Sequence, residues 1–273
     1  MTLALTSPVM VASGCGGTGR ELAAYGALAD LGGFVTRSIT IAPRAGGPAP
    51  RILETPSGLV HAVGLQNPGI DQFLALELPW LLQEGARVFV SVVGRSLGEY
   101  GELARRLGRT PGIAGVEVNL SAPDVEDGSV FDAREPFHAA SVVAAVHRDL
   151  PRGTPVLAKL RTDVLRVAEV ARAVLDAGAD AVVVGNALPA AMPDGRPAGL
   201  SGPATGPLAL RCLTEVVAAA PGATVVASGG IATVDDVRSA LRNGATAVQV
   251  GTALLHDPTT AHRLHAGIGE DEA

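Results

Sequence analysis

The residues able to do chemistry in this chain gather where short apolar segments end. Most of these segments are rich in valine, and a charged, amide, hydroxyl or glycine residue closes or follows them. Polar side chains are poor packing choices at such positions, because burying them without a partner costs free energy. We therefore expect the segment ends to face a ligand. In chain order they are Ser13-Gly14, Arg37-Ser38, Val93-Gly94, Asn119-Leu120-Ser121, Lys159, Gly185-Asn186, Gly229-Gly230 and Gly251-Thr252.

The last two segment ends have the features of a phosphate site. The stretch "ASGGIATVDDV" places Gly229 and Gly230 before a helical pattern, and "QVGTALL" places Gly251 and Thr252 at the next segment end. Glycine allows the backbone to approach an anion, and the start of a helix offers free amide N–H groups. Thr252 adds a hydroxyl. Ordinary tight turns between a strand and a helix are the alternative interpretation.

Lys159 ends the segment "PVLAKL" and needs an acceptor if it is buried. An ammonium group among apolar residues is costly unless an anion or a hydrogen-bond acceptor meets it. A phosphate-bearing cofactor whose ring needs a cation would meet this need. Alternatively, the long side chain extends to solvent and keeps its charge in water.

A repeated strand–helix unit would position these segment ends. Eight short β-branched segments alternate with helical patterns rich in Ala and Leu, and near-continuous apolar strands are typical of a parallel sheet covered by helices. Eight such units in about 250 residues predict a TIM (β/α)8 barrel, as a single domain over 1–273, with its active site at the C-terminal ends of the strands. An open, doubly wound sheet is the alternative fold. The expected strands are 8–13, 33–39, 87–93, 115–120, 155–160, 180–186, 224–230 and 247–252, and the expected helices are 21–31, 71–85, 99–108, 137–150, 165–178, 209–220, 234–244 and 258–266.

The composition excludes several classes of function. Of the 273 residues, 47% are hydrophobic and 18% are charged, so a large core can form. The formal net charge of −6 argues against a nucleic-acid surface. The sequence has no apolar run of about 18 residues and no basic flank at its N-terminus, which predicts a cytoplasmic protein without a membrane span. Cys15 and Cys212 match no metal spacing; we expect Cys212 to be a buried core thiol, whereas Cys15 lies in a glycine-rich turn.

Longer motifs, in one order along the chain, carry a resemblance to a known family. They are "ASGC", "VTRSIT", "PRAGGPAPRILETPSG", "VGLQNPG", "LPWL", "VEVNLS", "AKL", "GLSGPA" and "VQVGTA". From about residue 7 to 255 this order resembles the dihydroorotate dehydrogenases, most of all the soluble class-1 enzymes that work with an iron–sulfur electron-transfer subunit. The resemblance implies an FMN-binding TIM barrel, a homodimer, and an oxidoreductase of pyrimidine biosynthesis that acts on CH–CH bonds.

By this resemblance the cofactor half of the site is complete, and FMN is the expected cofactor. In the family, the lysine that matches Lys159 lies beside the flavin ring, where it stabilises negative charge on the reduced cofactor. The positions that would contact FMN are Ala12, Ser13, Gly14, Ser38, Asn119, Lys159, Asn186, Ser201, Gly202, Gly229, Gly230, Gly251 and Thr252.

The substrate half departs from the family pattern. A family lysine that helps to hold flavin and substrate is Arg37 here, and an asparagine before "GLQNPG" is His61. The residue after Asn186, usually serine or threonine, is Ala187, and the segment from Asn186 to "GLSGPA" is shorter than in similar proteins. The expected substrate-binding residues are Arg37, His61, Asn67, Asn119, Asp124 and Asn186.

The loop "NLSAPD" at 119–124 has lost the group that does the chemistry in the family. The family loop reads Asn-x-Ser-Cys-Pro-Asn, and its cysteine, or a serine in membrane-linked members, removes the C5 proton of dihydroorotate. Here Ala122 stands at the base position, and Asp124 replaces a substrate-binding asparagine.

Three residues are candidates for the missing base: His61, Ser121 and Asp124. His61 suits neutral pH because the unperturbed pKa of an imidazole is about 6.5, although a satisfied histidine on a surface loop is the alternative. Ser121 is adjacent to Ala122, but we expect its side chain to face another way. Asp124 either acts as a base or repels an acidic substrate, since an ionised carboxylate only accepts hydrogen bonds.

Two functions follow from these residues. The first is an FMN-dependent oxidoreductase that moves a hydride between FMN and dihydroorotate or, as Asp124 favours, a related cyclic amide or amino compound. The second is an FMN-binding pseudoenzyme or partner subunit without dehydrogenase activity. The resemblance implies a flavin/iron–sulfur electron-transfer subunit as partner, with fumarate or oxygen as alternative electron acceptors. The chain has no cysteine cluster of its own for an iron–sulfur centre.

Overall fold

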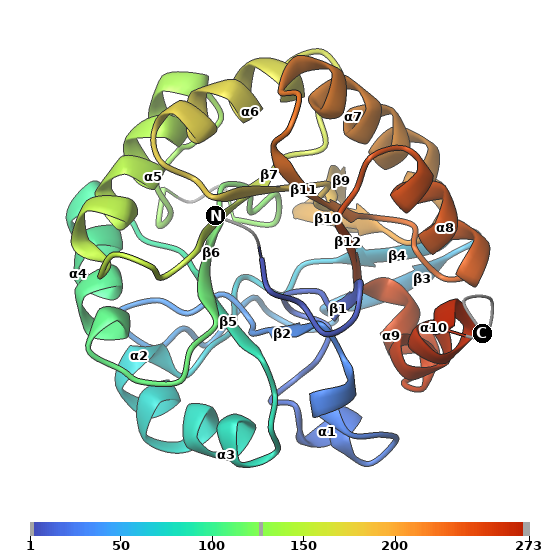
Figure 1. Cartoon of the computed structure of the whole chain (residues 1–273), viewed down its shortest axis with the longest axis horizontal. Helices are drawn as coiled ribbons and strands as arrows, with labels where there is room; N and C mark the ends of the chain where they lie inside the picture. The colour runs from blue at the N-terminus through green and yellow to red at the C-terminus, as the bar shows by residue number, and fades with distance from the viewer. Residues whose placement is uncertain (1–2, 126–127, 270–273) are drawn as a thin grey trace.

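A closed barrel of eight parallel strands forms the centre of the molecule, with helices around it (Figure 1). The computed structural model describes residues 3–125 and 128–269. Each expected strand is present and follows its predecessor around the barrel, which confirms the TIM barrel and excludes the open sheet. The strands are β1 (Val9–Val11), β2 (Gly33–Val35), β5 (Val88–Val92), β6 (Gly115–Asn119), β7 (Val156–Leu160), β8 (Ala181–Val184), β11 (Thr224–Ser228) and β12 (Ala247–Val250), which closes on β1.

Six of the expected helices form and surround the barrel. Side-chain caps fix the start of two of them: Ser96 accepts a hydrogen bond from the Glu99 amide before α4, and Thr233 and Asp236 form a capping box at α8. Apolar faces then hold the helices against the strands. The six are α4 (Leu97–Gly108), α5 (Pro136–Asp149), α6 (Val167–Asp176), α7 (Gly206–Ala219), α8 (Val234–Arg242) and α10 (Thr260–Gly269). Cys212 is fully buried in α7, as expected.

The first two expected helices are wrong as continuous elements. The segment 21–31 forms only α1 (Arg20–Ala23) and a 3-10 turn, η1 (Leu28–Asp30), because glycine at 26 weakens a helix and lies against the His262 ring. The segment 71–85 divides into α2 (Gly69–Gln72), a π-helical turn η2 (Phe73–Glu77) and α3 (Leu78–Gln83). Pro79 lacks the N–H that an α-helical bond to the preceding turn requires.

A second sheet was missed from the sequence. It is antiparallel, with the order β3-β4-β10-β9, and its strands are β3 (Ile52–Thr55), β4 (Gly58–His61), β9 (Leu188–Ala191) and β10 (Pro197–Ser201). Its strands come from the segments after β2 and β8, so it lies at the C-terminal end of the barrel (Figure 1). These strands are short and carry prolines and exposed positions, so they lack the apolar pattern that identified the barrel strands.

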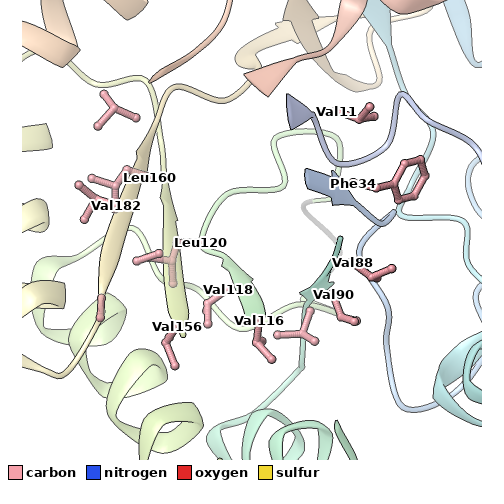
Figure 2. Packing of buried hydrophobic residues seen from close by; sticks show 14 of the residues in the cluster. Val11, Phe34, Val88, Val90, Val116, Val118, Leu120, Val156, Leu160 and Val182 are labelled. Carbon is pink, nitrogen blue, oxygen red and sulfur yellow. The ribbon is translucent and has the colours of Figure 1, made fainter. Parts of the chain in front are cut away.

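Successive side chains of each barrel strand point alternately outward and inward, so the core has one layer between strands and helices and another inside the barrel. Valines at 88, 90, 116, 118 and 156 belong to the cluster between strands and helices (Figure 2). Their neighbours point into the barrel, as the strand geometry requires. Near the N-terminal end this interior is apolar, with Met10, Phe89 and Leu157; farther along the same strands it contains Ser91, Glu117, Lys159 and Gln249.

Two observations bear on membranes and metals. No helix in the described ranges is long and apolar enough to span a bilayer. The same residues bring no three His, Cys, Asp or Glu side chains together as a metal site.

Candidate functional site

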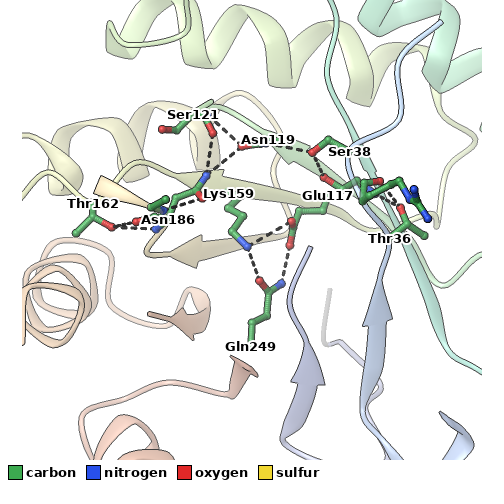
Figure 3. A network of polar contacts seen from close by, with 12 residues as sticks. Thr36, Ser38, Glu117, Asn119, Ser121, Lys159, Thr162, Asn186 and Gln249 are labelled. Carbon is green, nitrogen blue, oxygen red and sulfur yellow. Dashed lines mark hydrogen bonds and ion pairs between the residues drawn. The ribbon is translucent and has the colours of Figure 1, made fainter. Parts of the chain in front are cut away.

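The loops after β2, β6 and β8 meet at Asn119, the last residue of β6 (Figure 3). The Asn119 Nδ2 donates to Ser38 Oγ at 3.1 Å, and Ser38 Oγ lies 2.9 Å from Ser91 Oγ. The Asn119 Oδ1 accepts from Asn186 Nδ2 and from the Ser121 amide, both at 3.1 Å. The expected cofactor residues Ser38, Asn119 and Asn186 are therefore joined in one network.

Thr162, in the loop after β7, holds the backbone of Asn186. The Thr162 Oγ1 donates to the Asn186 carbonyl at 2.6 Å and accepts from its amide at 2.9 Å. The Asn186 Nδ2 also donates to the Ser121 carbonyl at 3.0 Å. With backbone and side chain both held, Asn186 and the loop that contains Ala122 keep one relative position.

Lys159 points into the barrel and does not reach solvent. Its side chain is 5% exposed, and its Nζ donates to Gln249 Oε1 at 2.7 Å. Gln249 Nε2 in turn donates to Glu117 Oε2 at 2.6 Å. This geometry removes the alternative in which Lys159 extends to water, and it supplies the acceptor that a buried ammonium needs.

At the proposed phosphate site the ends of β10, β11 and β12 come together. Thr252 Oγ1 donates to Ser201 Oγ at 2.8 Å, which joins the end of β12 to the end of β10. Within the described residues, the amides of Gly229, Gly230 and Gly251 have no acceptor in the chain, and the start of α9 (Thr252–His256) has no side-chain cap. Free N–H groups from two adjacent strand ends fit an anion such as a phosphate. The α8 start is different, because Asp236 already caps it.

Gly230 is packed against a second glycine in this end of the barrel. It has a φ of 74°, and a Cβ there would come within 2.4 Å of the Gly206 Cα. We expect Gly230→Ala to weaken FMN binding at least about tenfold and to lower Tm, because backbone must move and a positive φ costs roughly 1–3 kcal/mol. Fluorescence titration with FMN and thermal unfolding measure both.

Gly222→Ala is the matched control for that prediction. Gly222 has a similar φ of 82°, yet a Cβ there would have open space around it. The control should lose stability by the conformational cost alone and keep FMN affinity. Equal FMN affinity in the two variants would contradict a phosphate site at Gly230.

The end of β1 lies beside Gly251, one of the glycines whose amides have no acceptor in the described chain. A Cβ on Gly251 would lie 3.4 Å from the Ala12 Cβ and 3.5 Å from the Cys15 Sγ. Gly14 has a φ of 85° and open space where a side chain would stand. Burial raises the pKa of the Cys15 thiol to about 11 against the opposing charge of Lys159, so the thiol is neutral at pH 7. Ala12 thus lies beside Gly251, and Gly14 leaves open space at the same end of the barrel.

Arg37 has an unused donor. Its Nη2 lies 3.8 Å from Glu77 Oε1, on the π-helical turn, while its Nε is buried and has no hydrogen-bond partner in the described chain. Burial raises the pKa of Glu77, Arg37 lowers it and Glu21 raises it. A buried guanidinium N–H without an acceptor is costly, which fits a ligand carbonyl or carboxylate at this place.

Asn67 has a structural role. Its Oδ1 accepts from the amides of Thr40 at 3.2 Å and Gly69 at 2.9 Å, and its Nδ2 donates to the Leu65 carbonyl at 2.8 Å. Leu65 has a φ of 57°, which is uncommon for a side chain of this kind. In this structure the Asn67 amide holds the 63–69 loop and has little hydrogen-bonding capacity left for a substrate.

Asp124 is tied to the same loop. Its Oδ2 accepts from the Gly64 amide at 2.7 Å, across 60 residues of sequence. Ala122 lies in a turn in which its carbonyl accepts from the Val125 amide at 3.0 Å. Ser121 contributes its amide and carbonyl to the network around Asn119, and no hydrogen bond of its hydroxyl occurs in the described residues.

His61 is the expected base that the structure places best. The half-buried imidazole lies against Gly199, where a Cβ would come within 2.6 Å of its Cε1 and 2.8 Å of the Ala187 Cβ. Neither ring nitrogen has a partner in the described chain, and neither is sealed from solvent. Burial lowers the pKa of His61 and the Asp124 carboxylate raises it, so the neutral, basic form prevails at pH 7.

Sequence reasoning missed three polar residues of the barrel interior: Glu117, Gln249 and Ser91. A signal was present, because "VEV" and "VQV" each place one polar residue between outward-facing valines of a barrel strand. Alternation sends that residue into the barrel. It also missed Thr162, which follows a strand end and carries no distinguishing motif.

Comparison with known proteins identifies the family. The family profile described as "Dihydroorotate dehydrogenase" matches residues 1–271. A dihydroorotate dehydrogenase B (NAD(+)) catalytic subunit of Geotalea uraniireducens is 42% identical over 273 residues, which cover 97% of this chain and 88% of that protein. The protein of the same name from Desulforudis audaxviator is 42% identical over 275 residues, covering 97% and 89%.

A solved structure shares the fold. The dihydroorotate dehydrogenase of Eimeria tenella, crystallised with ferulenol, superposes with a TM-score of 0.80 at 20% identity, covering 96% of this chain and 80% of that one. At this identity the likeness concerns the barrel alone. The sequence matches, which run almost from end to end, show that the chain belongs to the dihydroorotate dehydrogenase family.

Proposed function

We propose that this chain is an FMN-dependent oxidoreductase that dehydrogenates a cyclic amide related to dihydroorotate, with His61 as the base. The family is one of flavin-dependent oxidoreductases, and the strand ends support FMN as the flavin. When bound, FMN would supply the acceptor for the hydride that leaves the substrate. The chain's own residues bind both molecules and remove the proton from the neighbouring carbon, so that a C=C bond forms.

The residues present fit FMN. The free amides of Gly229, Gly230 and Gly251 suit its phosphate, and the Lys159 ammonium suits the edge of a ring that becomes negative on reduction. The buried, unpartnered Nε of Arg37 suits a carbonyl oxygen.

The placement of His61 carries the proposal. Its ring lies next to the Ala187 methyl group and the Cα of Gly199, two positions with little or no side chain. Ala187 follows Asn186, which the Asn119 network holds beside the loop of Ala122. An imidazole with a lowered pKa and free ring nitrogens therefore supports a base on the sheet, opposite the loop that lost one.

The substrate proposal depends on Asp124. One carboxylate oxygen is held by the Gly64 amide, and the charge still acts on His61. The Asp124 carboxylate would repel a carboxylate of the substrate, whereas it would accept a hydrogen bond from an amide or amine N–H. Arg37 leaves one cationic donor for a ring carbonyl. These groups together favour a cyclic amide or amino compound over dihydroorotate.

We also propose a partner for the electrons. The relatives are named as catalytic subunits, a name that implies a further subunit beside them. For this chain we propose a flavin/iron–sulfur subunit, a homodimer of the barrel and a cytoplasmic location.

The alternative is an FMN-binding pseudoenzyme or partner subunit, which Ala122 favours because the loop has no proton acceptor at that position. Anaerobic mixing separates the two functions. FMN-loaded protein is mixed with a panel of cyclic amides, and flavin bleaching is followed. Bleaching by a panel member supports the enzyme, and FMN uptake without any bleaching supports the pseudoenzyme. If the protein takes up no FMN, the assignment of FMN as cofactor is wrong.

Dihydroorotate itself should reduce the bound flavin slowly. We expect a rate about tenfold to a hundredfold below that of a relative with the loop cysteine, because a positioned base contributes about 10²–10⁴ and His61 replaces only part of it. Stopped-flow absorbance measures the rate, with a dihydroorotate dehydrogenase whose loop has the cysteine as reference. Equal rates would show that the loss of the cysteine is fully compensated for this substrate.

A further inference from the structure

The barrel interior contains a chain of three buried polar side chains beneath the proposed flavin site. Glu117 lies on β6, Lys159 on β7 and Gln249 on β12, so the chain crosses the barrel from one wall to the other (Figure 3). Glu117 and Gln249 are fully buried and Lys159 is 4% exposed. Bulky apolar residues usually fill this position in a TIM barrel.

The hydrogen bonds of these three side chains run from the donor Lys159 through Gln249 to the acceptor Glu117. Gln249 accepts from Lys159 Nζ through Oε1 at 2.7 Å and donates to Glu117 Oε2 through Nε2 at 2.6 Å. The glutamine therefore connects a cation to an anion. Glu117 Oε1 lies 3.8 Å from Lys159 Nζ, beyond hydrogen-bond reach, and has no other partner in the described chain. Lys159 thus has one N–H committed to Gln249 and others left for a ligand.

Burial makes this arrangement costly unless it acts on something. An ammonium and a carboxylate removed from water offset their desolvation only with good geometry and further hydrogen bonds. Here the pair is held apart by a bridge, and one carboxylate oxygen lacks a donor. Apolar residues would stabilise the fold as well or better. We therefore expect the charges to serve the proposed flavin site and not the stability of the barrel.

We propose that Glu117 and Gln249 are positioning residues that direct the Lys159 ammonium at the flavin, and so set how strongly reduced flavin is favoured. This inference rests on the proposed flavin site. Glu117 supplies a counter-charge 3.8 Å from the ammonium, and Gln249 fixes the place of the nitrogen. Cys15 also interacts electrostatically with this lysine, and its thiol is neutral at pH 7.

Glu117→Gln tests the charge, because it keeps the shape of the side chain. Without its counter-charge the buried lysine loses its proton more easily. At high pH the variant should therefore lose the cation beside the reduced flavin, and the affinity for reduced relative to oxidised FMN should fall by about tenfold. The midpoint potential of bound FMN, measured from pH 6 to 9, should therefore fall more steeply with pH in E117Q than in the unmodified protein.

Three further variants assign the effect. In Glu117→Gln with Lys159→Met, the extra pH dependence should disappear, because the titrating group is gone. Glu117→Asp should restore most of the original profile, since it keeps the charge. Gln249→Met removes the bridge without adding a charge, and should shift the potential at every pH.

The outcomes separate this inference from the proposed function. If unmodified protein takes up no FMN, the cofactor proposal is wrong. If E117Q and Q249M are folded by circular dichroism, bind FMN and keep the original potential and pH profile, the positioning role is wrong while the flavin site stands. If E117Q fails to fold, the Q249M potential decides: a shift supports the role, and an unchanged value overturns it.

Discussion

We expect His61→Asn to slow flavin reduction by the natural substrate by about 10²–10⁴-fold, the range for a positioned base. The asparagine fills similar space beside Gly199 and Ala187, and cannot accept a proton at neutral pH. FMN binding should remain, because His61 lies on the antiparallel sheet and not among the phosphate or Lys159 groups. Single-turnover absorbance measures the loss.

The pH profile should identify His61 by its sign. Burial lowers its pKa below the ordinary value of 6.5, so the imidazole is a competent base above that lowered pKa and is lost as the pH falls through it. The rate should therefore be flat at neutral pH and fall on the acid side. Asp124→Asn removes the charge that raises this pKa, so the acid limb should move to lower pH.

His147→Asn is the matched control, since His147 is exposed on α5, away from the strand ends. It should leave the rate and the pH profile as they are. A His61→Asn variant with an unchanged rate and acid limb would show that the base is another residue, with Ser121 next to be tested.

The barrel could be predicted because its signal is repeated. Every barrel strand is an apolar run, and alternation with helical patterns specifies the parallel order. The sheet of β3, β4, β9 and β10 could not, because its short strands are partly exposed and its central pair, β4 with β10, joins segments far apart in the sequence, as in the pairing of His61 with Gly199. Local patterns carry no information on such pairing. The second helix failed for a local reason that was visible, the proline at 79.

The residues of the site at strand ends could be predicted, but the contacts between its loops could not. Strand ends identified Asn119 and Asn186, whose side chains are hydrogen-bonded, and Lys159, which is the register partner of Asn119 on the next strand. Neither the Asp124–Gly64 hydrogen bond nor the contact of His61 with Gly199 follows from spacing, because each joins loops from different parts of the chain. The interior charges were missed for another reason: Glu117 and Gln249 each stand alone within an apolar strand and lie before its end, so the strand ends do not mark them.

The largest expected gain comes from rebuilding the family loop for dihydroorotate. Ala122→Cys alone places a thiol in the turn that Val125 closes, but His61 and Asp124 still shape the place of the substrate carboxylate. We expect this single variant to gain little. Asp124→Asn keeps an acceptor for the Gly64 amide and removes the repulsive charge, and His61→Asn supplies an amide donor.

The triple variant should gain at least about tenfold more than the product of its separate gains, about 1.4 kcal/mol of coupling, because substrate binding and proton removal act on one complex. Single-turnover flavin reduction by dihydroorotate measures each variant. The control replaces Ser121, one residue earlier, by cysteine together with the same two changes, and should gain only what the pocket changes give. Full recovery by Ala122→Cys alone would mean that Asp124 and His61 do not touch the substrate. An inert triple variant would mean that the segment after Asn186 has moved the pocket, so that position 122 no longer faces the reacting carbon.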